Sequence, residues 1–436
     1  MKRPYRSLRP HSVGSGRAGP GPPDPQDCIL TVEAVGARGD GLARTERGLV
    51  YAPFSLAGER LQARVLGDRA EIAHILEESP ERVRPPCAVF GRCGGCQLQH
   101  WAGEPYLAWK HGLVVEALAK RGIEAAVEPI TAVWGEGRRR AGLHAARSGR
   151  ELRFGFVRRG GGGVEPITAC PLLAPALEAA LPALKRLAAQ VAPERGDVVL
   201  QCLLTTAGLD VDVKGAGRVE AHRARLPHLI QAALEADLAR LSFEGEPLVA
   251  PRTPRLQIGS VLVEPPPGAF VQPTAAGEAA LAARVLEVAQ GGRRFADLFC
   301  GMGAFALRLA ELGEVLAVEG DAAMLAALQR AADGAGGRLH AVASLHRDLL
   351  RSPLAALELK RVDTVVIDPP RSGARLQAEQ IVASRVERVI AVSCDPASFA
   401  RDARALLDGG FRLGKVSPFD QFRWSAHVEL VAEFAR

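Results

Sequence analysis

Arg388–Arg401, RVIAVSCDPASFAR, is the stretch that decides the fold of the C-terminal part of this chain. Val389 and its three apolar successors form a short run that is typical of a buried strand. The Ser-Cys-Asp-Pro that follows ends this strand, because Pro396 cannot continue a ladder and keeps Asp395 out of the helical region. Cys394 therefore lies where a strand meets its loop, which is the edge at which open parallel α/β sheets bind ligands.

The thiol of Cys394 allows two interpretations. Its thiolate could act as a nucleophile, since a thiolate is the most reactive side-chain group near neutral pH. It could also be a small buried apolar residue, which is the commoner role of a single cysteine at a strand end. The other motifs of the chain decide between the two.

Apolar, strand-like runs alternate with helical stretches from about residue 270 onward. This order predicts a doubly wound parallel α/β sheet. Four runs end in glycine or polar motifs: DLFCGMG at 297–303, VLAVEG at 315–320, DTVVIDPPR at 363–371 and RVIAVSCDP at 388–396.

The first two of these runs predict a binding site for S-adenosylmethionine. Gly301 and Gly303 allow the backbone to approach a ligand closely. Glu319 ends the next strand, where an acid can accept hydrogen bonds from both hydroxyls of a ribose. NAD is the weaker candidate, because Phe305 and Ala306 follow and the dinucleotide motif lacks its third glycine.

The third run ends in Asp368-Pro369-Pro370-Arg371. The two prolines fix the backbone, so we expect Asp368 and its carbonyl to face the cleft. An aromatic residue in the fourth position is typical of methyl transfer to an amino nitrogen, where its ring stacks on the base. Arg371 stands there instead and indicates different chemistry.

The composition limits the class of protein. A length of 436 residues predicts two to four domains at about 150 residues each. The chain is 47% hydrophobic, as in a soluble globular protein, and no apolar run approaches the ~18 residues that span a membrane. A net charge of +6 and a pI near 9.0 favour nucleic acid as a partner without deciding it. Residues 1–26 are basic and rich in glycine and proline, without a secretory signal; we expect a disordered arm and a reducing, cytoplasmic location.

Residues 27–84 alternate short apolar runs with glycine turns. This pattern predicts a five-stranded, OB-like β-barrel, a fold that often binds RNA. The turn Gly39-Asp40-Gly41 and the later Ala52-Pro53 give the segment a resemblance to the TRAM domain of RNA-modifying enzymes. A generic barrel without a ligand suits these residues equally well.

Four cysteines predict a metal centre in the central region, residues 85–254. Three have the spacing Cys-x5-Cys-x2-Cys, and the fourth is followed by proline, as ligands of iron–sulfur clusters often are. A zinc site usually shows two Cys-x2-Cys pairs, and here there is one. A [4Fe–4S] cluster is therefore favoured over zinc, and unligated thiols are the third alternative. The four are Cys87, Cys93, Cys96 and Cys170.

The same region, for which the sequence indicates an α+β domain, carries an arginine-rich stretch. Eight arginines lie between residues 138 and 159, and Glu151 is the acid that opposes them. Phe154 and Phe156 are interleaved with these arginines, so we expect contact with an RNA backbone. The alternative is an ordinary solvated charged surface.

Behind the cysteines come five motifs in this order: DLFCGMGAFAL, VEG, DPPRSG, SCDP and FDQFRWSAHVEL. In this combination residues 28–436 resemble the RNA (uracil-5-)-methyltransferase family. The resemblance implies a Rossmann-like class I methyltransferase domain over 255–436, with Cys394 as nucleophile and Glu429 as general base. It implies that the cofactor or target is lined by Gln272, Phe299, Gly301, Gly303, Glu319, Asp348 and Asp368. It further implies that Cys87, Cys93, Cys96 and Cys170 hold a [4Fe–4S] cluster.

The expected chemistry requires both a thiol and a base. Uracil C5 is too poor a nucleophile to take a methyl group directly, and a thiolate that adds at C6 makes an enolate with electron density on C5. The C5 proton must then leave, which needs a base. A cytosine-C5 enzyme fits less well, because such enzymes use a second cysteine in a Pro-Cys motif and Cys300 lies in Phe-Cys-Gly.

We therefore expect a uridine-C5 methyltransferase that modifies RNA, with 23S ribosomal RNA favoured over transfer RNA. A non-catalytic RNA-binding iron–sulfur protein is the alternative from another class. We expect a monomer without membrane contact. Ala304 and Thr274 stand where the family commonly has asparagine, so fewer polar contacts are expected around the amino-acid end of the cofactor.

Overall fold

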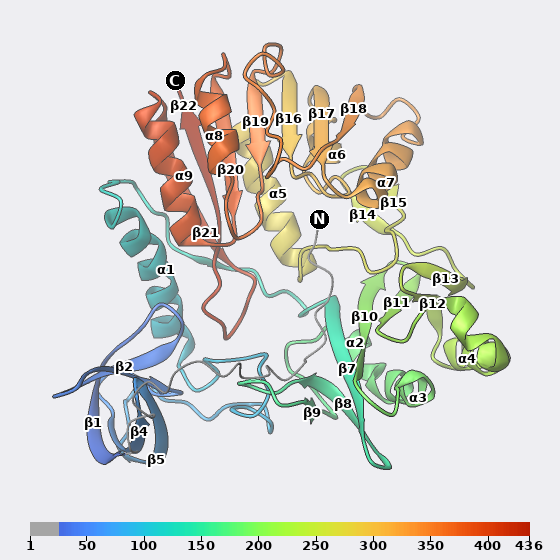
Figure 1. The fold of residues 1–436 in the computed structure, drawn as a ribbon. Helices are drawn as coiled ribbons and strands as arrows, with labels where there is room; N and C mark the ends of the chain where they lie inside the picture. Colours follow the sequence, from blue (N-terminus) through green and yellow to red (C-terminus); the bar gives the residue numbers. More distant parts are fainter. Residues whose placement is uncertain (1–25) are drawn as a thin grey trace, which may run out of the picture.

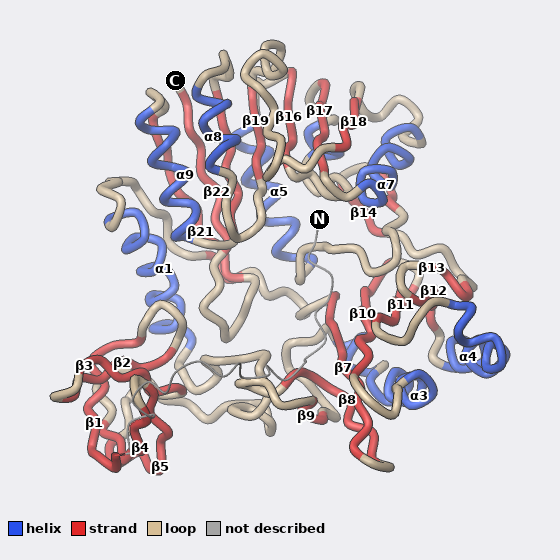
Figure 2. The backbone as a smooth tube through the Cα atoms, in the orientation of Figure 1, coloured by secondary structure: helices blue, strands red, loops and turns tan. Residues whose placement is uncertain are grey.

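A computed structural model of the protein describes residues 26–436 (Figure 1, Figure 2). Three bodies of β-structure follow one another along the chain: a closed N-terminal barrel, a seven-stranded central sheet and an eight-stranded C-terminal sheet. The predicted arm, residues 1–26, lies outside the described residues apart from Gln26. No helix within residues 26–436 is long and apolar enough to cross a membrane.

The N-terminal body is a closed barrel of five strands, as the glycine turns predicted. Its strands are β1 (Gln26–Val35), β2 (Asp40–Thr45), β3 (Gly48–Pro53), β4 (Arg60–Leu66) and β5 (Arg69–Glu77). They close in the order β1-β2-β3-β5-β4, and Leu30, Val32 and Leu61 are buried in the interior. Gly41 has no room for a side chain, since a Cβ there would lie 2.1 Å from Ser55 Oγ.

The central body is a sheet with helices packed against it. Its elements are β7 (Arg140–Ser148), β8 (Glu151–Val157), β9 (Val164–Pro166), α2 (Pro175–Ala179), α3 (Leu181–Val191), β10 (Asp197–Thr205), β11 (Gly208–Lys214), the 3₁₀ helix η1 (Val219–Arg225), α4 (Leu226–Glu235), β12 (Leu238–Phe243) and β13 (Glu246–Val249). The strand order is β13-β12-β11-β10-β7-β8-β9, and β11 and β12 are the parallel pair in an otherwise antiparallel sheet. Leu184, Leu187 and Leu229 from α3 and α4 are fully buried in its core.

The C-terminal body contains the predicted parallel sheet. Its elements are β14 (Leu256–Ile258), β15 (Val261–Val263), α5 (Ala275–Ala289), β16 (Arg294–Leu298), α6 (Ala306–Leu309), β17 (Glu314–Glu319), α7 (Ala322–Asp333), β18 (Val342–His346), β19 (Thr364–Ile367), α8 (Arg375–Val382), β20 (Arg388–Ser393), α9 (Pro396–Asp408), β21 (Arg412–Asp420) and β22 (Glu429–Ala435). β18-β17-β16-β19-β20 are parallel neighbours, which confirms the doubly wound order. The antiparallel β22 follows β20 and pairs with β21 on its other side.

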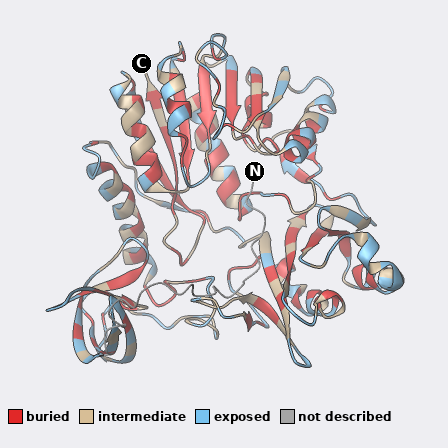
Figure 3. Cartoon of the chain, in the orientation of Figure 1, coloured by how far each residue is buried: buried red, intermediate tan, exposed pale blue. Residues whose placement is uncertain are grey.

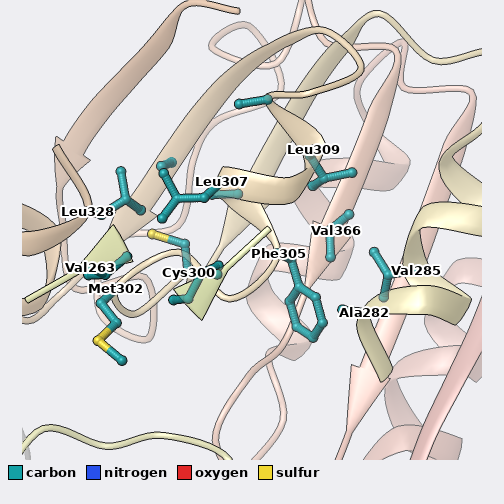
Figure 4. Packing of buried hydrophobic residues seen from close by; sticks show 14 of the residues in the cluster. Val263, Ala282, Val285, Cys300, Met302, Phe305, Leu307, Leu309, Leu328 and Val366 are labelled. Carbon is teal, nitrogen blue, oxygen red and sulfur yellow. The ribbon is translucent and has the colours of Figure 1, made fainter. Parts of the chain in front are cut away.

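Each strand of this sheet serves two cores, because successive side chains point to opposite faces. On β20, Val389 and Ala391 belong to the cluster with α8 and α9, whereas Ile390 and Val392 belong to the cluster with α5 and β15. In Figure 3 the strands appear largely buried between helices with exposed outer faces. Figure 4 shows part of the second cluster: Val263, Ala282, Val285, Phe305 and Val366.

Two elements from the central part of the sequence pack on the C-terminal sheet. α1 (Gly103–Ala119) contributes Val114 and Leu118 to the buried cluster that contains α9. β6 (Thr131–Ala132) pairs in parallel with the end of β21. The region assigned to the central domain therefore supplies one helix and one edge strand to the C-terminal body.

Candidate active site

Residues predicted for catalysis and cofactor binding gather at one edge of the C-terminal sheet. Strands β16 to β20 are parallel, so their carboxyl ends meet at this edge. Gly301 and Gly303 form the turn after β16, and Glu319 ends β17. Asp368 and Cys394 directly follow β19 and β20.

Glu319 holds the glycine turn. Its Oε2 accepts a hydrogen bond of 2.9 Å from Gly301 N, and its Oε1 accepts one of 2.8 Å from Asp321 N. The φ angles of Gly301 and Gly303 are +56° and +96°, which favour glycine. A Cβ at Gly303 would also come within 2.8 Å of Leu307 Cγ. Because a carboxylate offers about four lone-pair sites, Glu319 keeps acceptor capacity for ribose hydroxyls.

Phe299 directly precedes this turn, and Asp348 lies in the loop after β18, against the loop that follows Glu319. Phe299 has a φ of +64°, a left-handed conformation that costs a non-glycine residue about 1–3 kcal/mol and that clusters at functional sites. Asp348 lies two residues beyond β18, where its Oδ1 accepts a hydrogen bond of 3.1 Å from Leu350 N. A Cβ at Gly320 would lie 3.5 Å from Asp348 Cα, so the loops after β17 and β18 touch.

Cys394 and Glu429 come from neighbouring antiparallel strands. The ladder of β20 and β22 ends with Ser393 opposite Leu430, so Cys394 directly follows the one strand at the point where Glu429 begins the other. Burial raises the pKa of the Cys394 thiol to about 12, and the negative charge of Glu429 adds to the effect. Glu429 is 3% exposed, and burial followed by the charge of Asp368 raises its pKa to about 8. The structure thus brings together the two side chains predicted as nucleophile and base.

Four acids converge on this edge: Asp297, Glu319, Asp368 and Glu429. Burial raises the pKa of Asp368 to about 7. Asp297, inside β16, is fully buried, and a backbone hydrogen bond from Ala306 only partly offsets the effect of this burial on its pKa. Burial and then the charge of Asp368 raise the pKa of Asp297 well above its usual range. The sequence prediction missed Asp297, although an acid inside an apolar strand was a signal for it. Such a group of acids attracts a cationic ligand.

Gln272 and Gln421 connect Glu429 to helix α5. Gln421 Nε2 donates a hydrogen bond of 2.7 Å to Gln272 Oε1, and both side chains are buried. Gln421 also hydrogen-bonds Glu429, which opposes the effect of burial on the pKa of that carboxyl. Thr274 caps α5, because its Oγ1 accepts a hydrogen bond of 2.9 Å from Gly277 N. Thr274 therefore serves as the N-cap of α5, a structural role that its departure from the family motif did not reveal.

Arg371 and His427 were left without a role by the sequence prediction. Arg371 Nη2 donates to His427 Nδ1 at 2.5 Å, and the second ring nitrogen lies 3.3 Å away. The edge of the His427 ring meets the Phe422 ring, with centroids 5.6 Å apart. Burial, followed by the charge of Arg371, lowers the pKa of His427 to about 4. The same positive charge opposes the rise in the pKa of Cys394 and of Glu429.

A buried ion pair anchors the start of the segment that leads to Glu429. Lys110 Nζ from α1 lies 2.6 Å from Asp420 Oδ1, and both side chains are 0% exposed. Tyr106 OH donates a hydrogen bond of 2.9 Å to the other oxygen of Asp420. α1 therefore fixes the end of β21 directly beside Gln421.

Comparison with known proteins assigns this arrangement to a family. Residues 260–433 match the model of the tRNA (uracil-5-)-methyltransferase family. An uncharacterized RNA methyltransferase of Caulobacter vibrioides is 44% identical, over 93% of this chain and 99% of its own length. The 23S rRNA (uracil(1939)-C(5))-methyltransferase RlmD of Pseudomonas fluorescens is 33% identical, over 100% of this chain and 99% of its own length. The chain belongs to the RNA (uracil-5-)-methyltransferase family.

This methyltransferase shares its fold with a solved relative. The tRNA (uracil-54, C5)-methyltransferase of Pyrococcus abyssi, in complex with S-adenosyl-L-homocysteine, matches with a TM-score of 0.74. The match covers 93% of this chain and 99% of that chain at 20% identity, which shows a common fold alone. As a member of the family, the protein is an RNA methyltransferase whose methyl donor is S-adenosylmethionine.

The four cysteines of this methyltransferase line one cavity of about 320 Å³. Burial raises the pKa of Cys93, Cys96 and Cys170, and in each case the charge of another thiol of the set raises it further, so the sulfurs are neighbours. Within the part of the chain that the structure describes, however, no three His, Cys, Asp or Glu side chains converge closely enough to hold a single metal ion. All four thiols are free of disulfides.

The backbone links the cysteine loop to the segment before Glu429. Trp424 O accepts hydrogen bonds of 2.8 Å from Gln97 N and 3.1 Å from Leu98 N. Trp424 has a φ of +61° and packs with Cys96, so its conformation depends on this loop. Sequence patterns could not reveal a contact that joins segments more than 300 residues apart.

The arginine-rich stretch 138–159 has more partners than its sequence indicated. Acids from other segments form ion pairs in it: Arg139 with Glu278, Arg158 with Glu165, and Arg159 with Asp40. Phe154 is 1% exposed in the core of the central sheet, so its ring does not support the contact with RNA that we expected from this stretch. Counting acids within the stretch overestimated its free positive charge, because the neutralising carboxylates lie outside it, two of them more than 100 residues from their arginine.

Proposed function

We propose that this enzyme transfers a methyl group from S-adenosylmethionine to C5 of a uridine in RNA through a covalent bond between Cys394 Sγ and C6. The observation that supports the proposal is the closeness of Cys394 and Glu429: Ser393 pairs with Leu430 at the end of the β20–β22 ladder, and the charge of Glu429 acts on the Cys394 thiol. The turn at Gly301, held by Glu319, lies at the same sheet edge. A nucleophile, a base and an acid suited to ribose are the parts that the reaction needs.

Cys394 would begin the reaction. Its thiolate adds to C6, and the electron pair of the C5–C6 bond moves onto C5 and the C4 carbonyl as an enolate. C5 would then take the methyl group of S-adenosylmethionine, whose sulfur would keep the electron pair of the broken S–CH3 bond and leave as part of S-adenosylhomocysteine. Burial keeps the thiol protonated in the free enzyme, since its pKa is about 12. The positive charge of Arg371 favours the thiolate when the substrate excludes water from the site.

Glu429 would end the reaction. After methyl transfer, C5 carries both a proton and the new methyl group. Glu429 accepts this proton, the electrons of the C–H bond restore the C5–C6 double bond, and the Cys394 thiolate leaves. A base works best when its pKa lies near the operating pH, and the pKa of Glu429 is raised to about 8.

The glycine turn and the acids around it would hold S-adenosylmethionine. Gly301 and Gly303 offer a close approach to backbone, and Glu319 has spare acceptor capacity for the ribose. We further assign Phe299 and Asp348 to this pocket, because Phe299 directly precedes the turn and Asp348 lies against the loop that follows Glu319. Other predicted pocket residues are Gln272 and Asp368. The positive charge of the cofactor suits the acids at this edge.

We propose ribosomal RNA as the substrate. Support comes from the relative that acts on 23S rRNA, which is 33% identical over 100% of this chain. The solved enzyme that acts on tRNA is 20% identical. Mapping methyluridine by mass spectrometry in RNA from cells that lack this protein would identify the target; loss from tRNA alone would overturn the ribosomal assignment.

We propose that Cys87, Cys93, Cys96 and Cys170 hold a [4Fe–4S] cluster. A zinc ion needs four sulfurs about 2.3 Å from one point, whereas a cluster takes each thiolate on a different iron. A shared centre is supported by the four cysteines lining one cavity and by the effect of their thiols on one another's pKa, and the single Cys-x2-Cys pair favours a cluster over zinc. Protein purified without oxygen should be brown with broad visible absorbance; a colourless, zinc-loaded preparation would contradict the cluster.

We also propose that the barrel at 27–84 is a TRAM-like module that contacts RNA. OB-like barrels bind RNA on exposed faces, and Ile29, Leu49 and Leu66 of this barrel are large apolar residues with 59%, 38% and 52% exposure. RNA binding by the intact enzyme should weaken in Ile29→Ser and Leu66→Ser. Unchanged RNA affinity in both variants would remove the barrel from the interface.

The covalent step has a direct test. RNA containing 5-fluorouridine should form a stable adduct with the wild-type enzyme, because fluorine cannot leave as the C5 proton does. Cys394→Ala should lose both the adduct and methyl transfer. Cys28→Ala, which removes a thiol of the barrel, should keep both. Retention of the adduct in Cys394→Ala would overturn the proposed mechanism.

A further inference from the structure

We infer that His427 is a positioning residue that holds the guanidinium of Arg371 beside Cys394, an inference that rests on the proposed function. Arg371 Nη2 donates to His427 Nδ1 at 2.5 Å, and Nε2 of the ring lies 3.3 Å from the same nitrogen. His427 itself is placed two residues before Glu429, at the start of β22. The contact thus joins the loop after β19 to the strand that carries the base.

The imidazole acts as an acceptor in this contact. Arginine has donors and no acceptor, so one ring nitrogen of His427 must be unprotonated. The charged groups that face the ring are Arg371, Lys110 from α1, Arg138 from the central body and Asp395 from the start of α9. Three of these four are positive, and together with burial they keep the ring neutral near pH 7. The edge contact with the Phe422 ring fixes the plane of the imidazole.

Arg371 needs such a partner, because it is exposed and its long side chain is otherwise free to adopt many rotamers. The charged groups that act on Cys394 are Glu429, Asp368, Arg371 and Asp395. Arg371 is the basic member of this group of four, and the three acids all disfavour a thiolate. Loss of the His427 contact would therefore let the positively charged guanidinium of Arg371 move away from Cys394 Sγ, although Arg371 itself would still be present.

The test measures the reactivity of the Cys394 thiol in the intact enzyme without RNA. Alkylation by iodoacetamide is followed for the Cys394 peptide by mass spectrometry at several pH values between 7.5 and 9.5. At each pH the rate follows the small fraction of thiolate. His427→Leu should slow this alkylation about three- to tenfold, which corresponds to about half to one pKa unit. His427→Asn should react like wild type, since its amide oxygen can still accept from Arg371.

A double variant separates positioning from a general effect on structure. Arg371→Gln should slow alkylation at least as much as His427→Leu, and combining the two should add nothing further. His74→Leu makes the same replacement on the exposed face of the barrel and should react like wild type.

Equal alkylation rates in His427→Leu and wild type would overturn the inference, as would a further drop when His427→Leu is added to Arg371→Gln. Neither result would touch the proposed function, which stands or falls with the 5-fluorouridine adduct of Cys394→Ala.

Discussion

The C-terminal sheet edge and the cysteine-lined cavity are held together by different kinds of support. At the sheet edge, Glu319, Asp368 and Cys394 directly end or follow strands whose positions are fixed by ladder hydrogen bonds. In the cavity, the sulfurs come from the loop before α1 and from the segment after β9, where few ladder bonds act. The difference teaches that strand ends fix the residues of the first site, whereas the residues of the second are carried mainly by loops.

Among the variants that test the sheet edge, Glu429→Gln is expected to have the largest effect on turnover. This change keeps the shape of the side chain but removes the base, so the C5 proton cannot leave. We expect turnover to fall about 10²- to 10⁴-fold, while a covalent complex between Cys394 and methylated RNA accumulates. Denaturing gels and mass spectrometry of the trapped complex provide the measurement.

The matched control is Glu433→Gln, farther along β22, which should turn over normally. Rapid release of methylated RNA by Glu429→Gln would show that another group removes the proton.

A smaller effect is expected when the ribose acid is removed. Glu319→Ala should raise the KM for S-adenosylmethionine about 30- to 150-fold, because about two hydrogen-bonded contacts at about 1–1.5 kcal/mol each are lost. Calorimetric titration with S-adenosylhomocysteine would measure the affinity directly. Glu314→Ala, at the exposed start of the same strand, should leave it unchanged, and equal losses in both variants would argue against a role for Glu319.

The pH dependence of turnover follows from Glu429. Its pKa is raised to about 8, so the ionised base is lost as pH falls through that value. Where proton removal limits turnover, the rate should drop about tenfold for each pH unit below it. The apparent value belongs jointly to Glu429 and Asp368, because the two acids interact. A rate that is flat between pH 6 and 9 would remove Glu429 from the limiting step.

A substitution in the cysteine-lined cavity should lower stability and leave cofactor affinity unchanged, unlike a substitution at the sheet edge. Cys170→Ser should abolish the visible absorbance of the cluster and lower Tm, yet leave the affinity for S-adenosylhomocysteine within about twofold. Absorbance, thermal unfolding and calorimetry of the same sample provide the comparison. Cys28→Ser is the control, since this thiol lies in the barrel. A large loss of cofactor affinity in Cys170→Ser would show that the two sites are not separable in this way.

The smallest expected effect concerns the helix cap beside the sheet edge. Thr274→Ala removes the acceptor for Gly277 N and should cost about 1 kcal/mol of stability, or about 2–4 °C in Tm. Thr274→Asn restores a good cap and should recover most of that loss. If Thr274→Asn instead tightens cofactor binding tenfold, the threonine would be a compromise between capping and affinity.

The parallel sheet and its edge residues could be predicted because one short-range rule governs them. An apolar run that stops at Glu319 or Cys394 places that residue at the carboxyl end of a strand, and parallel order brings all such ends together. The roles of Arg371 and His427 were not predicted, because their contact joins two loops that are far apart in the sequence. Asp297 was missed because a search for periodic patterns gives no weight to a single acid in an apolar strand, although that acid is itself a local signal. The ion pairs of Arg139, for instance, depend on an acid far along the chain.

The hydrogen bonds from Gln97 N and Leu98 N to Trp424 O have a practical consequence for transplanting this catalytic sheet. Residues 255–436 alone would lack the donors that keep Trp424 in its left-handed conformation, and they would also lack Lys110, the buried partner of Asp420. A minimal excised enzyme must therefore carry the cysteine loop and α1 along with the sheet, even though neither belongs to the pocket for the methyl donor.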